Sequence, residues 1–440
     1  MAGFGSSSRR WLAAFALWVL VTCACLSLEC DAAEKPEQDS GTNIEGRTQL
    51  KFPRSEYDAA KNKVALVTGA AGFVGSHVVQ HCLDLGMRVI ALDDLSGGFV
   101  HNVPEGATFL QGDVKDANFL QAIFKEHSID FVYHLAAYAA EGLSHFVRSF
   151  NYRTNLVGSV ELLNMAIKFG VKCFVFTSSI AVYGSINDLS QMQNPNRTLA
   201  TSGRKIEDSV LTEEDKPAPE DPYGIAKYAF EMDLHAAHEL FGLDYVIFRP
   251  HNVYGPNQNM FDKYRNVVGI FFNQVFRNLP MTIFGAGEQV RAFSYIDDVA
   301  PIISRGPLVK EARNQAFNVG GDTPYTINEL AVSISEAAGS LDHPRSYQPA
   351  RMEVEVAVAS HEKVRRVFDP PTPVLLKEGL ERTVAWYKEK GQFFRPVEFE
   401  SVEVKANMPP SWQRPDLQEA VTCHGTRVGE IASPGKSDEL

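Results

Sequence analysis

A tyrosine and a lysine at helical spacing are the residues of this sequence best suited to proton transfer. Tyr223 and Lys227 lie four residues apart just after Pro222, where a helix is expected to begin, and residues at this spacing share one face of a helix. A phenol normally titrates at a pKa of about 10. We therefore expect Lys227 to lower the pKa of Tyr223, so that the phenol can act as a base near neutral pH.

Hydroxyl groups at the end of a predicted strand lie at a second position where chemistry can occur. The segment Thr177-Ser178-Ser179 ends the apolar run 173–177. The carboxyl ends of parallel strands in an α/β sheet form the edge at which ligands bind. These hydroxyls are therefore predicted to face a ligand.

A glycine-rich turn between a predicted strand and a predicted helix indicates a bound pyrophosphate. The strand 64–68 runs into Gly69, Gly72 and Gly75, which have the spacing GxxGxxG. Gly69 permits the tight turn, Gly72 lets the backbone approach a phosphate at the helix N-terminus, and Gly75 allows close packing of the helix. The predicted pyrophosphate site consists of Gly69, Gly72, Phe73, Val74 and Gly75.

Carboxylates at the ends of the next two strands predict the rest of a dinucleotide site. Asp93 follows the strand 88–92, where it can accept hydrogen bonds from both ribose hydroxyls and would repel a 2′-phosphate. NAD is therefore favoured over NADP, and the neighbouring Asp94 leaves the choice between the two aspartates open. Asp113 ends the third strand and is predicted, together with Val114, to meet the adenine.

Strands and helices alternate along the part of the chain that carries these motifs. Apolar runs at 64–67, 88–92, 108–111, 131–135, 173–177 and 245–248 alternate with helical stretches at 117–126, 154–169 and 226–241. This alternation predicts an α/β fold with a doubly wound parallel sheet of the Rossmann type. The mixed pattern after residue 250 predicts a smaller mixed α/β lobe for the substrate, whose last helix covers about 375–390.

The same patterns divide the chain into predicted domains. We expect the NAD-binding domain at 63–250, with a polar insertion near 185–219, and the substrate lobe at 251–391. Residues 34–62 lack apolar periodicity and are predicted to be a linker. Residues 392–440 are predicted to be a tail without a core.

Both ends of the chain have features of targeting signals. Arg9-Arg10 precede the apolar run 11–28, which is typical of a secretory signal within residues 1–33. An uncleaved membrane anchor is the alternative, since about 20 apolar residues can span a bilayer. The ending Ser437-Asp438-Glu439-Leu440 is similar to an endoplasmic-reticulum retention signal. Together with the glycosylation sequon at Asn196, these features predict residence in the lumen of that compartment.

The composition argues against several classes of function. The 440 residues include 42 Lys and Arg against 54 Asp and Glu, for a net charge of −12. An acidic surface repels phosphate backbones, so nucleic-acid binding is disfavoured as the main function. Six scattered cysteines do not suit a disulfide scaffold, and no CxxC pair indicates a metal site. Cys82 and Cys173 are expected to be buried apolar residues.

As a set, these motifs resemble those of the extended short-chain dehydrogenase/reductases, and specifically of the NAD-dependent epimerase/dehydratase family. The resemblance covers about residues 63–390 and is strongest to the UDP-hexose 4-epimerases of that family. It rests on Gly69–Gly75, Asp93–Ser96, His134–Ala137, Thr177–Gly184, Tyr223–Lys227, Arg249–Pro256 and Arg291–Asp298. It implies a tightly held NAD, with Ala136 as a further contact, and a nucleotide-diphosphate sugar in the second lobe. It also implies a homodimer formed through helices near 154–169 and 226–241.

The resemblance implies a catalytic cycle with no net redox change. Tyr223 takes the proton from the sugar 4-hydroxyl while the hydride of carbon 4 passes to NAD. Ser179 hydrogen-bonds the same oxygen, and Lys227 tunes the tyrosine. The 4-keto sugar then turns over and receives the hydride on its other face. The residues that match contacts to the sugar diphosphate are Asn252, Arg291 and, as a candidate second clamp, Arg351.

Departures from the family pattern bear on the subclass. Dehydratases and decarboxylating synthases of the family carry an acid two places after the catalytic hydroxyl, whereas Ile180 and Ala181 follow Ser179 here, so simple 4-epimerisation is favoured. The stretch 138–141 lacks a lysine that the most similar epimerases place near the cofactor phosphates. The alternatives are a UDP-glucuronate 4-epimerase or decarboxylase, another nucleotide-sugar dehydratase, an NAD-binding protein without catalysis and, more distantly, a hydroxysteroid dehydrogenase.

Overall fold

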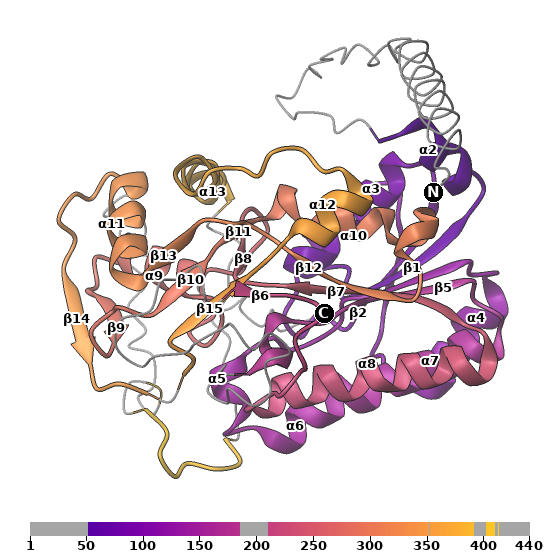
Figure 1. The fold of residues 1–440 in the computed structure, drawn as a ribbon, viewed down its shortest axis with the longest axis horizontal. Helices are drawn as coiled ribbons and strands as arrows, with labels where there is room; N and C mark the ends of the chain where they lie inside the picture. The colour runs from indigo at the N-terminus through magenta and orange to yellow at the C-terminus, as the bar shows by residue number, and fades with distance from the viewer. Residues whose placement is uncertain (1–51, 185–209, 352, 391–401, 410–411, 413–440) are drawn as a thin grey trace, which may run out of the picture. The chain divides into compact units, whose positions relative to one another are not determined.

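The computed structural model describes a folded unit that begins at Phe52 (Figure 1). The described residues are 52–184, 210–351, 353–390, 402–409 and 412. The predicted signal segment, the sequon at Asn196, most of the predicted insertion and the ending Ser437–Leu440 lie outside the described residues.

A seven-stranded parallel sheet forms the centre of this unit, in the order β12-β7-β5-β4-β1-β2-β3. Its strands are β1 (Val64–Thr68), β2 (Arg88–Asp93), β3 (Thr108–Gln111), β4 (Phe131–His134), β5 (Cys173–Thr177), β7 (Asp244–Pro250) and β12 (Gln315–Val319). The chain starts at β1, adds β2 and β3 on one side, and then adds the other strands on the opposite side. This reversal opens a crevice at the carboxyl ends of β1 and β4, and it confirms the predicted Rossmann-type doubly wound sheet.

Helices cover both faces of the sheet, as a parallel sheet requires. Helices α4 (Ala117–Glu126), α7 (Gly158–Lys168) and α8 (Pro222–Phe241) lie on one face, and α3 (Phe73–Asp84), α10 (Ala300–Arg305) and α12 (Glu362–Phe368) lie on the other (Figure 1). Helix α7 begins later than predicted because a π-helical turn, Arg153–Val157, precedes it. The short connecting elements here are α5 (Glu141–Ser144), α6 (Arg148–Tyr152), η1 (Val100–Asn102) and η3 (Ile180–Tyr183).

Apolar side chains fill the space between the sheet and α8. Phe174 and Phe176 of β5 are fully buried, as is Phe230 of α8. The ring centroids of Phe176 and Phe230 lie 4.7 Å apart. Full burial of such a side chain contributes roughly 1.5–3 kcal/mol. The strands read as continuous apolar runs because helices bury them from both sides.

The second lobe is a smaller mixed α/β unit, as predicted. One sheet has the order β13-β10-β15-β6, and two smaller sheets pair β8 with β11 and β9 with β14. The strands are β6 (Val210–Leu211), β8 (Val253–Tyr254), β9 (Met281–Phe284), β10 (Val290–Ala292), β11 (Ser294–Tyr295), β13 (Pro324–Thr326), β14 (Arg345–Gln348) and β15 (Val356–Ala359). The helices and 3-10 turns are α9 (Val267–Phe276), α11 (Ile327–Ala338), α13 (Leu376–Lys390), η6 (Ile296–Asp298), η7 (Gly306–Leu308) and η8 (Lys310–Ala312).

The predicted boundary after residue 250 does not separate the two lobes in space. Strand β12, from the predicted substrate lobe, pairs with β7 in the main sheet. Strand β6, from the end of the predicted insertion, pairs with β15 in the sheet of the second lobe. An apolar pattern indicates a strand, but it does not indicate which sheet edge will receive that strand.

The predicted linker 34–62 ends earlier than expected, because its last part is folded. Helix α2 (Arg54–Ala60) lies within it, and Phe52 is buried. The Glu56 carboxylate accepts hydrogen bonds of 2.7 and 2.8 Å from the Arg305 guanidinium of α10. This helix is attached to the fold by an ion pair and not by a stripe of apolar side chains. Its sequence therefore lacks the apolar periodicity that identifies a packed helix.

The two cysteines within the described residues are buried free thiols, as predicted. They are Cys82 of α3 and Cys173 of β5, and burial raises the pKa of each thiol to about 12. They therefore behave as small apolar core residues. Among the described helices, none has the length and apolar character needed to cross a membrane.

Candidate active site

A large cavity lies at the carboxyl edge of the main sheet and is lined by both lobes. Its volume of about 1340 Å³ exceeds the roughly 300–1,000 Å³ typical of a pocket for one small ligand. All of the predicted site residues line this cavity: Gly69, Gly72, Phe73, Val74, Gly75, Asp93, Asp113, Val114, Ala136, Ser179, Tyr223, Lys227, Asn252, Arg291 and Arg351. The fold therefore brings together residues that are far apart in the sequence, from Gly69 to Arg351. The cavity is large enough for a cofactor and a substrate side by side.

The glycine-rich turn requires glycine at its first and last positions. Gly69 has φ +70°, and a Cβ there would lie 2.7 Å from the backbone nitrogen of Ala136. A Cβ at Gly75 would overlap the carbonyl oxygen of Gly69. Both obstacles are backbone atoms that cannot rotate away. The turn therefore lies flat against the end of β4 and opens directly into α3.

These surroundings fit a dinucleotide. Helix α3 begins after Gly72, which has no side chain to cap it, and the N–H groups of a first helical turn favour an anion. The buried hydroxyls of Thr177 and Ser178 line the same cavity and have no hydrogen-bond partner among the residues that the structure describes. Buried polar groups normally have such a partner, so these two oxygens indicate a polar ligand.

The geometry distinguishes Asp93 from Asp94. The Asp93 carboxylate lies on the cavity and accepts hydrogen bonds from the backbone nitrogens of Ala71, at 3.0 Å, and Leu95, at 2.8 Å. Burial raises the pKa of Asp93, and the two backbone hydrogen bonds oppose this effect. Asp94 also lines the cavity, but it is exposed and accepts its hydrogen bond from the nearby backbone nitrogen of Ser96, at 2.8 Å. Asp93 is therefore the carboxylate held in a fixed position beside the turn.

Replacing Asp93 by alanine is expected to weaken the discrimination between NAD and NADP. The change removes the carboxylate that can hold the ribose hydroxyls and repel a 2′-phosphate, so NAD affinity should fall about 10-fold or more while NADP affinity falls less. Calorimetric titration of the cofactor-stripped protein with each dinucleotide measures both affinities. Asp94→Ala is the matched control and should change neither. An unaltered ratio of the two affinities in Asp93→Ala would assign the ribose contact elsewhere.

The predicted adenine contacts line the same cavity. Asp113 accepts a hydrogen bond of 2.8 Å from the backbone nitrogen of Lys115 and also pairs with the Lys115 ammonium at 2.8 Å. Val114 is buried, and the Ala136 nitrogen donates to Thr68 Oγ1 at 3.2 Å. Their roles toward the cofactor stay predictions.

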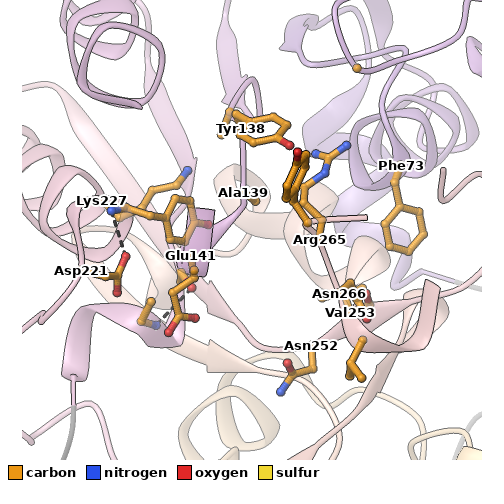
Figure 2. Close-up of a pocket in the computed structure, with 18 of the residues that line it drawn as sticks. Phe73, Tyr138, Ala139, Glu141, Asp221, Lys227, Asn252, Val253, Arg265 and Asn266 are labelled. Carbon is orange, nitrogen blue, oxygen red and sulfur yellow. Dashed lines mark hydrogen bonds between the residues drawn. The ribbon is translucent and has the colours of Figure 1, made fainter. Parts of the chain in front are cut away.

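The start of α8 holds Tyr223 against the strand-end hydroxyls. The Asp221 carboxylate caps the helix by accepting hydrogen bonds of 2.9 Å from the nitrogens of both Tyr223 and Gly224. The Ser179 side chain lies close enough to the Tyr223 phenol to oppose the rise of its pKa. Lys227 follows one turn later and donates to the carbonyl oxygen of Thr177 at 2.8 Å. Figure 2 shows Lys227 and Asp221 on one side of the cavity.

Burial changes the pKa values of both Tyr223 and Lys227. Burial raises the pKa of Tyr223, and the nearby Ser179 side chain opposes this only in part. Burial also lowers the pKa of Lys227 to about 7. In the protein alone, too little water surrounds Lys227 to keep it fully charged. The predicted lowering of the tyrosine pKa also needs the positive nicotinamide ring of bound NAD, so it stays a prediction.

Two arginines converge on one carboxylate at the side of the second lobe. Arg291 Nη2 lies 3.8 Å and Arg351 Nη2 lies 3.1 Å from Glu353 Oε2. Arg291 also donates to the carbonyl oxygens of Val354, at 2.5 Å, and Glu355, at 3.2 Å. Burial lowers the pKa of Arg291. Two guanidinium groups around one anion form a site suited to a diphosphate.

Asn252 follows the end of β7 and lies near the strand that carries Arg291. Its backbone has φ +42°, a conformation that asparagine adopts more readily than most residues. Its side-chain nitrogen donates to the carbonyl oxygen of Ala292 at 3.0 Å. Asn252 thus lies beside the strand that carries Arg291, on the wall of the cavity (Figure 2).

Sequence reasoning missed Glu141, which lines the cavity at the start of α5. Its side chain is exposed to solvent within the open cavity, although the surrounding walls desolvate the carboxyl enough to raise its pKa. Asp221 adds to this rise, and Arg291 and Arg351 oppose it. Its position seven residues after β4, at the ligand-binding edge of the sheet, was the signal that could have identified it.

Arg265 is a second residue that the sequence reasoning missed. It lies on the cavity lining, and Figure 2 shows it apart from Lys227, toward the side on which Phe73 lies. Its Nε donates to Asp262 at 2.7 Å, and its guanidinium lies 5.1 Å from the ring centroid of Tyr138. Arg265 is a cation on the cavity lining that can bind an anionic group, and the stretch 138–141 lacks the lysine that the resemblance places near the cofactor phosphates. Its three-residue spacing from Asp262 was the only local signal.

Comparison with known proteins identifies the family. Residues 65–320 match the model of the NAD dependent epimerase/dehydratase family. The chain belongs to this family. Its cofactor is NAD, and the chain is an enzyme that acts on nucleotide sugars.

The similar proteins include both epimerases and dehydratases. The UDP-glucose 4-epimerase of Mycolicibacterium smegmatis is 32% identical over 336 residues, which cover 74% of this chain and 99% of that protein. The crystal structure of UDP-glucose 4-epimerase from Thermotoga maritima with UDP-glucose is 34% identical, with a TM-score of 0.65 over 74% of this chain and 99% of that one. The dTDP-glucose 4,6-dehydratase DesIV of Streptomyces venezuelae, with NAD bound, is 27% identical, with a TM-score of 0.66 over 76% of this chain and 100% of that one. Because these relatives are matched over almost their whole length, this chain has segments that they lack.

Proposed function

We propose that the chain catalyses the 4-epimerisation of a UDP-hexose of the UDP-glucose and UDP-galactose type, through a transient 4-keto sugar. The observation that carries this proposal is the grouping of Ser179, Tyr223 and Lys227 in a cavity that also presents Arg291. Similarity to UDP-glucose 4-epimerases over most of the chain supports it.

In the proposed cycle, Tyr223 takes the proton from the sugar 4-hydroxyl and Ser179 donates a hydrogen bond to the same oxygen. Bound NAD supplies a reversible hydride acceptor and the positive charge of its oxidised ring. Lys227 lies 5.7 Å from the centroid of the Tyr223 ring and adds to that positive field once it is protonated. Arg291 and Arg351 hold the diphosphate, so that the keto sugar can turn over while the nucleotide stays in register.

The residues beside Ser179 favour epimerisation within the family. Ile180 and Ala181 line the cavity directly after the hydroxyl. Neither side chain can move a proton, so the position at which elimination or decarboxylation needs an acid carries none.

Product analysis tests this proposal. We expect the purified chain to interconvert UDP-glucose and UDP-galactose when the products are followed by NMR. Parallel incubations with UDP-glucuronate and UDP-xylose serve as comparisons. Formation of UDP-xylose from UDP-glucuronate would contradict the proposal, and formation of UDP-galacturonate would instead assign the chain to the uronate 4-epimerases.

Glu141 favours a second candidate, a nucleotide-sugar 4,6-dehydratase. Its pKa of about 7 suits a group that both takes and gives a proton near neutral pH, and it lies on the cavity lining together with Tyr223. A 4-keto-6-deoxy sugar among the products, lost in Glu141→Gln, would support this candidate. A Glu141→Gln protein that still interconverts the two hexoses would exclude a catalytic role for the carboxyl.

An exposed apolar strip supports the proposal of a homodimer. Apolar side chains of α8 and of the turn before α7 are exposed to solvent. Helices α7 and α8 lie side by side (Figure 1). The exposed side chains are Val157, Ile225, Met232, Leu240 and Phe241. Exposed apolar strips of this kind mark interaction surfaces. Light scattering should give the dimer mass, and Met232→Lys should give the monomer.

The terminal sequences support the proposal that the protein resides in the lumen of the endoplasmic reticulum. Deletion of the last four residues, Ser437–Leu440, should then release the protein into the medium of expressing cells. Retention of the shortened chain inside the cell, with an uncleaved N-terminal segment in the membrane fraction, would favour the anchor instead.

A further inference from the structure

The segment after α13 returns to the cavity. Within the described part of residues 392–440, side chains of Val404, Ala406, Asn407, Met408, Pro409 and Trp412 line the cavity together with Arg351. The sequence predicts here a tail without a core. That prediction is wrong for residues 402–409 and for Trp412, because their packing partners, from Leu143 to Arg351, belong to other parts of the chain.

Polar contacts anchor this segment on α6. The Glu403 carboxylate accepts hydrogen bonds from the backbone nitrogens of Ser149, at 2.7 Å, and Phe150, at 2.9 Å. The backbone nitrogens of Glu403 and Val404 donate to the carbonyl oxygen of Phe146, at 2.9 and 3.1 Å. Four hydrogen bonds, two with α6 and two with Phe146 just before it, hold the segment in a defined register.

Apolar contacts continue from the anchor to the cavity. Met408 is buried in a cluster with Leu143, Val147 and Tyr264. The Trp412 ring meets that of Tyr264 edge to face, with centroids 5.5 Å apart. A Cβ at Gly142 would lie 3.1 Å from the Trp412 ring. The indole is therefore wedged between α5 and the second lobe.

Trp412 also contacts one of the two arginines of the predicted diphosphate site. The Arg351 guanidinium lies 5.8 Å from the centroid of the Trp412 ring and 4.6 Å from that of Phe284. Otherwise Arg351 has the Glu353 ion pair, and 36% of its side chain is exposed. An arginine at such a site is free to adopt many rotamers, and this freedom is lost when it binds an anion.

We propose that Trp412 is a positioning residue of the nucleotide-sugar site, which holds Arg351 ready for the substrate diphosphate. The inference rests on the proposed function in one respect, the use of Arg351 as a diphosphate contact. Two aromatic rings restrict the guanidinium before the substrate arrives, so the side chain loses less conformational freedom on binding. The C-terminal segment is thereby part of the substrate site.

Binding of UDP to the full chain tests this inference. Trp412→Ala should raise the UDP Kd, measured by calorimetry, about 3- to 20-fold. The KM for UDP-glucose should rise in parallel, while kcat changes less than about twofold and the bound NAD is retained. Trp412→Phe keeps an aromatic face and should restore most of the affinity. Unaltered UDP affinity in Trp412→Ala, or tighter binding, would overturn the inference.

A double-mutant cycle separates positioning from a general loss of structure. Arg351→Gln should weaken UDP binding, and adding Trp412→Ala to it should have little further effect, because the two residues act through one contact. Additive losses would overturn the inference. Glu403→Ala releases the anchor without altering the cavity wall and should also weaken UDP binding, whereas Glu389→Ala on α13, which is 69% exposed, should not.

The outcomes for this inference and for the proposed function are distinct. If the unaltered chain turns over no UDP-hexose but its UDP affinity falls in Trp412→Ala, the proposed epimerisation fails and the positioning role stands. If the chain epimerises UDP-glucose and Trp412→Ala leaves both KM and UDP affinity unaltered, the positioning role fails and the proposed function stands.

Discussion

Replacing Tyr223 by phenylalanine is expected to lower turnover about 100- to 10,000-fold, the range by which a general base contributes. The substitution removes one oxygen and leaves the buried ring, whose side chain is only 7% exposed, in its place at the start of α8. Ser179 can still donate a hydrogen bond to the sugar oxygen, but the variant lacks the base that removes the proton of the 4-hydroxyl. NAD should stay bound, because the glycine-rich turn and Asp93 are untouched.

Two measurements check this expectation. The steady-state kcat for interconversion of UDP-glucose and UDP-galactose gives the loss, and a native mass spectrum gives the amount of retained NAD. Tyr228→Phe is the matched control, since Tyr228 lies on the same helix and outside the cavity lining, and it should keep the original turnover. A Tyr223→Phe protein with normal turnover would remove the phenol from the mechanism.

Replacing Glu231 by glutamine is expected to destabilise the fold by about 3–5 kcal/mol, the typical cost of leaving one partner of a buried ion pair unpaired. Glu231 of α8 accepts two hydrogen bonds from Arg249 of β7, at 3.0 and 2.6 Å, and both side chains are nearly buried. Arg249 also donates to the hydroxyl of Tyr183, which in turn donates to Asn318 of β12. Loss of the carboxylate therefore leaves a buried cation where α8, β7, β12 and η3 meet.

The loss is measured as the shift of the urea midpoint multiplied by the m-value. Glu378→Gln is the matched control: it also removes an arginine's partner, but Glu378 and Arg382 are 53% and 43% exposed, and exposed pairs contribute about 0–1 kcal/mol. Equal losses in the two variants would mean that the Arg249 guanidinium finds another partner when Glu231 is replaced.

Local patterns predicted the elements that carry the site. The apolar run of β1, the glycines of the turn and the first residues of α3 are consecutive in the chain, so sterics and hydrogen bonding within a few residues determine their conformation. The same holds for Pro222 at the start of α8. The family motifs added the roles of Ser179, Asn252 and Arg291, which no local pattern provides.

The linker and the tail show where such patterns fail. Helix α2 is attached by one ion pair to Arg305, 249 residues away, and the segment 402–409 by Glu403 and Met408. Neither segment has an apolar stripe of its own. A polar anchor of this kind leaves no periodic pattern of apolar residues in the sequence, because the residue that it binds lies in a distant part of the chain.

By itself, the sequence determined the strand and helix types, the parallel sheet, the pyrophosphate turn and the tyrosine–lysine pair, since each depends on neighbours within a few residues. Only the tertiary structure decided that Glu141, Arg265 and Trp412 lie on the cavity, that Asp93 rather than Asp94 is buried and bonded to two backbone nitrogens, and that burial raises the pKa of Tyr223 in the protein alone. These properties depend on which distant side chains exclude water from a group and which charges lie beside it, and the order of residues along the chain does not contain that information.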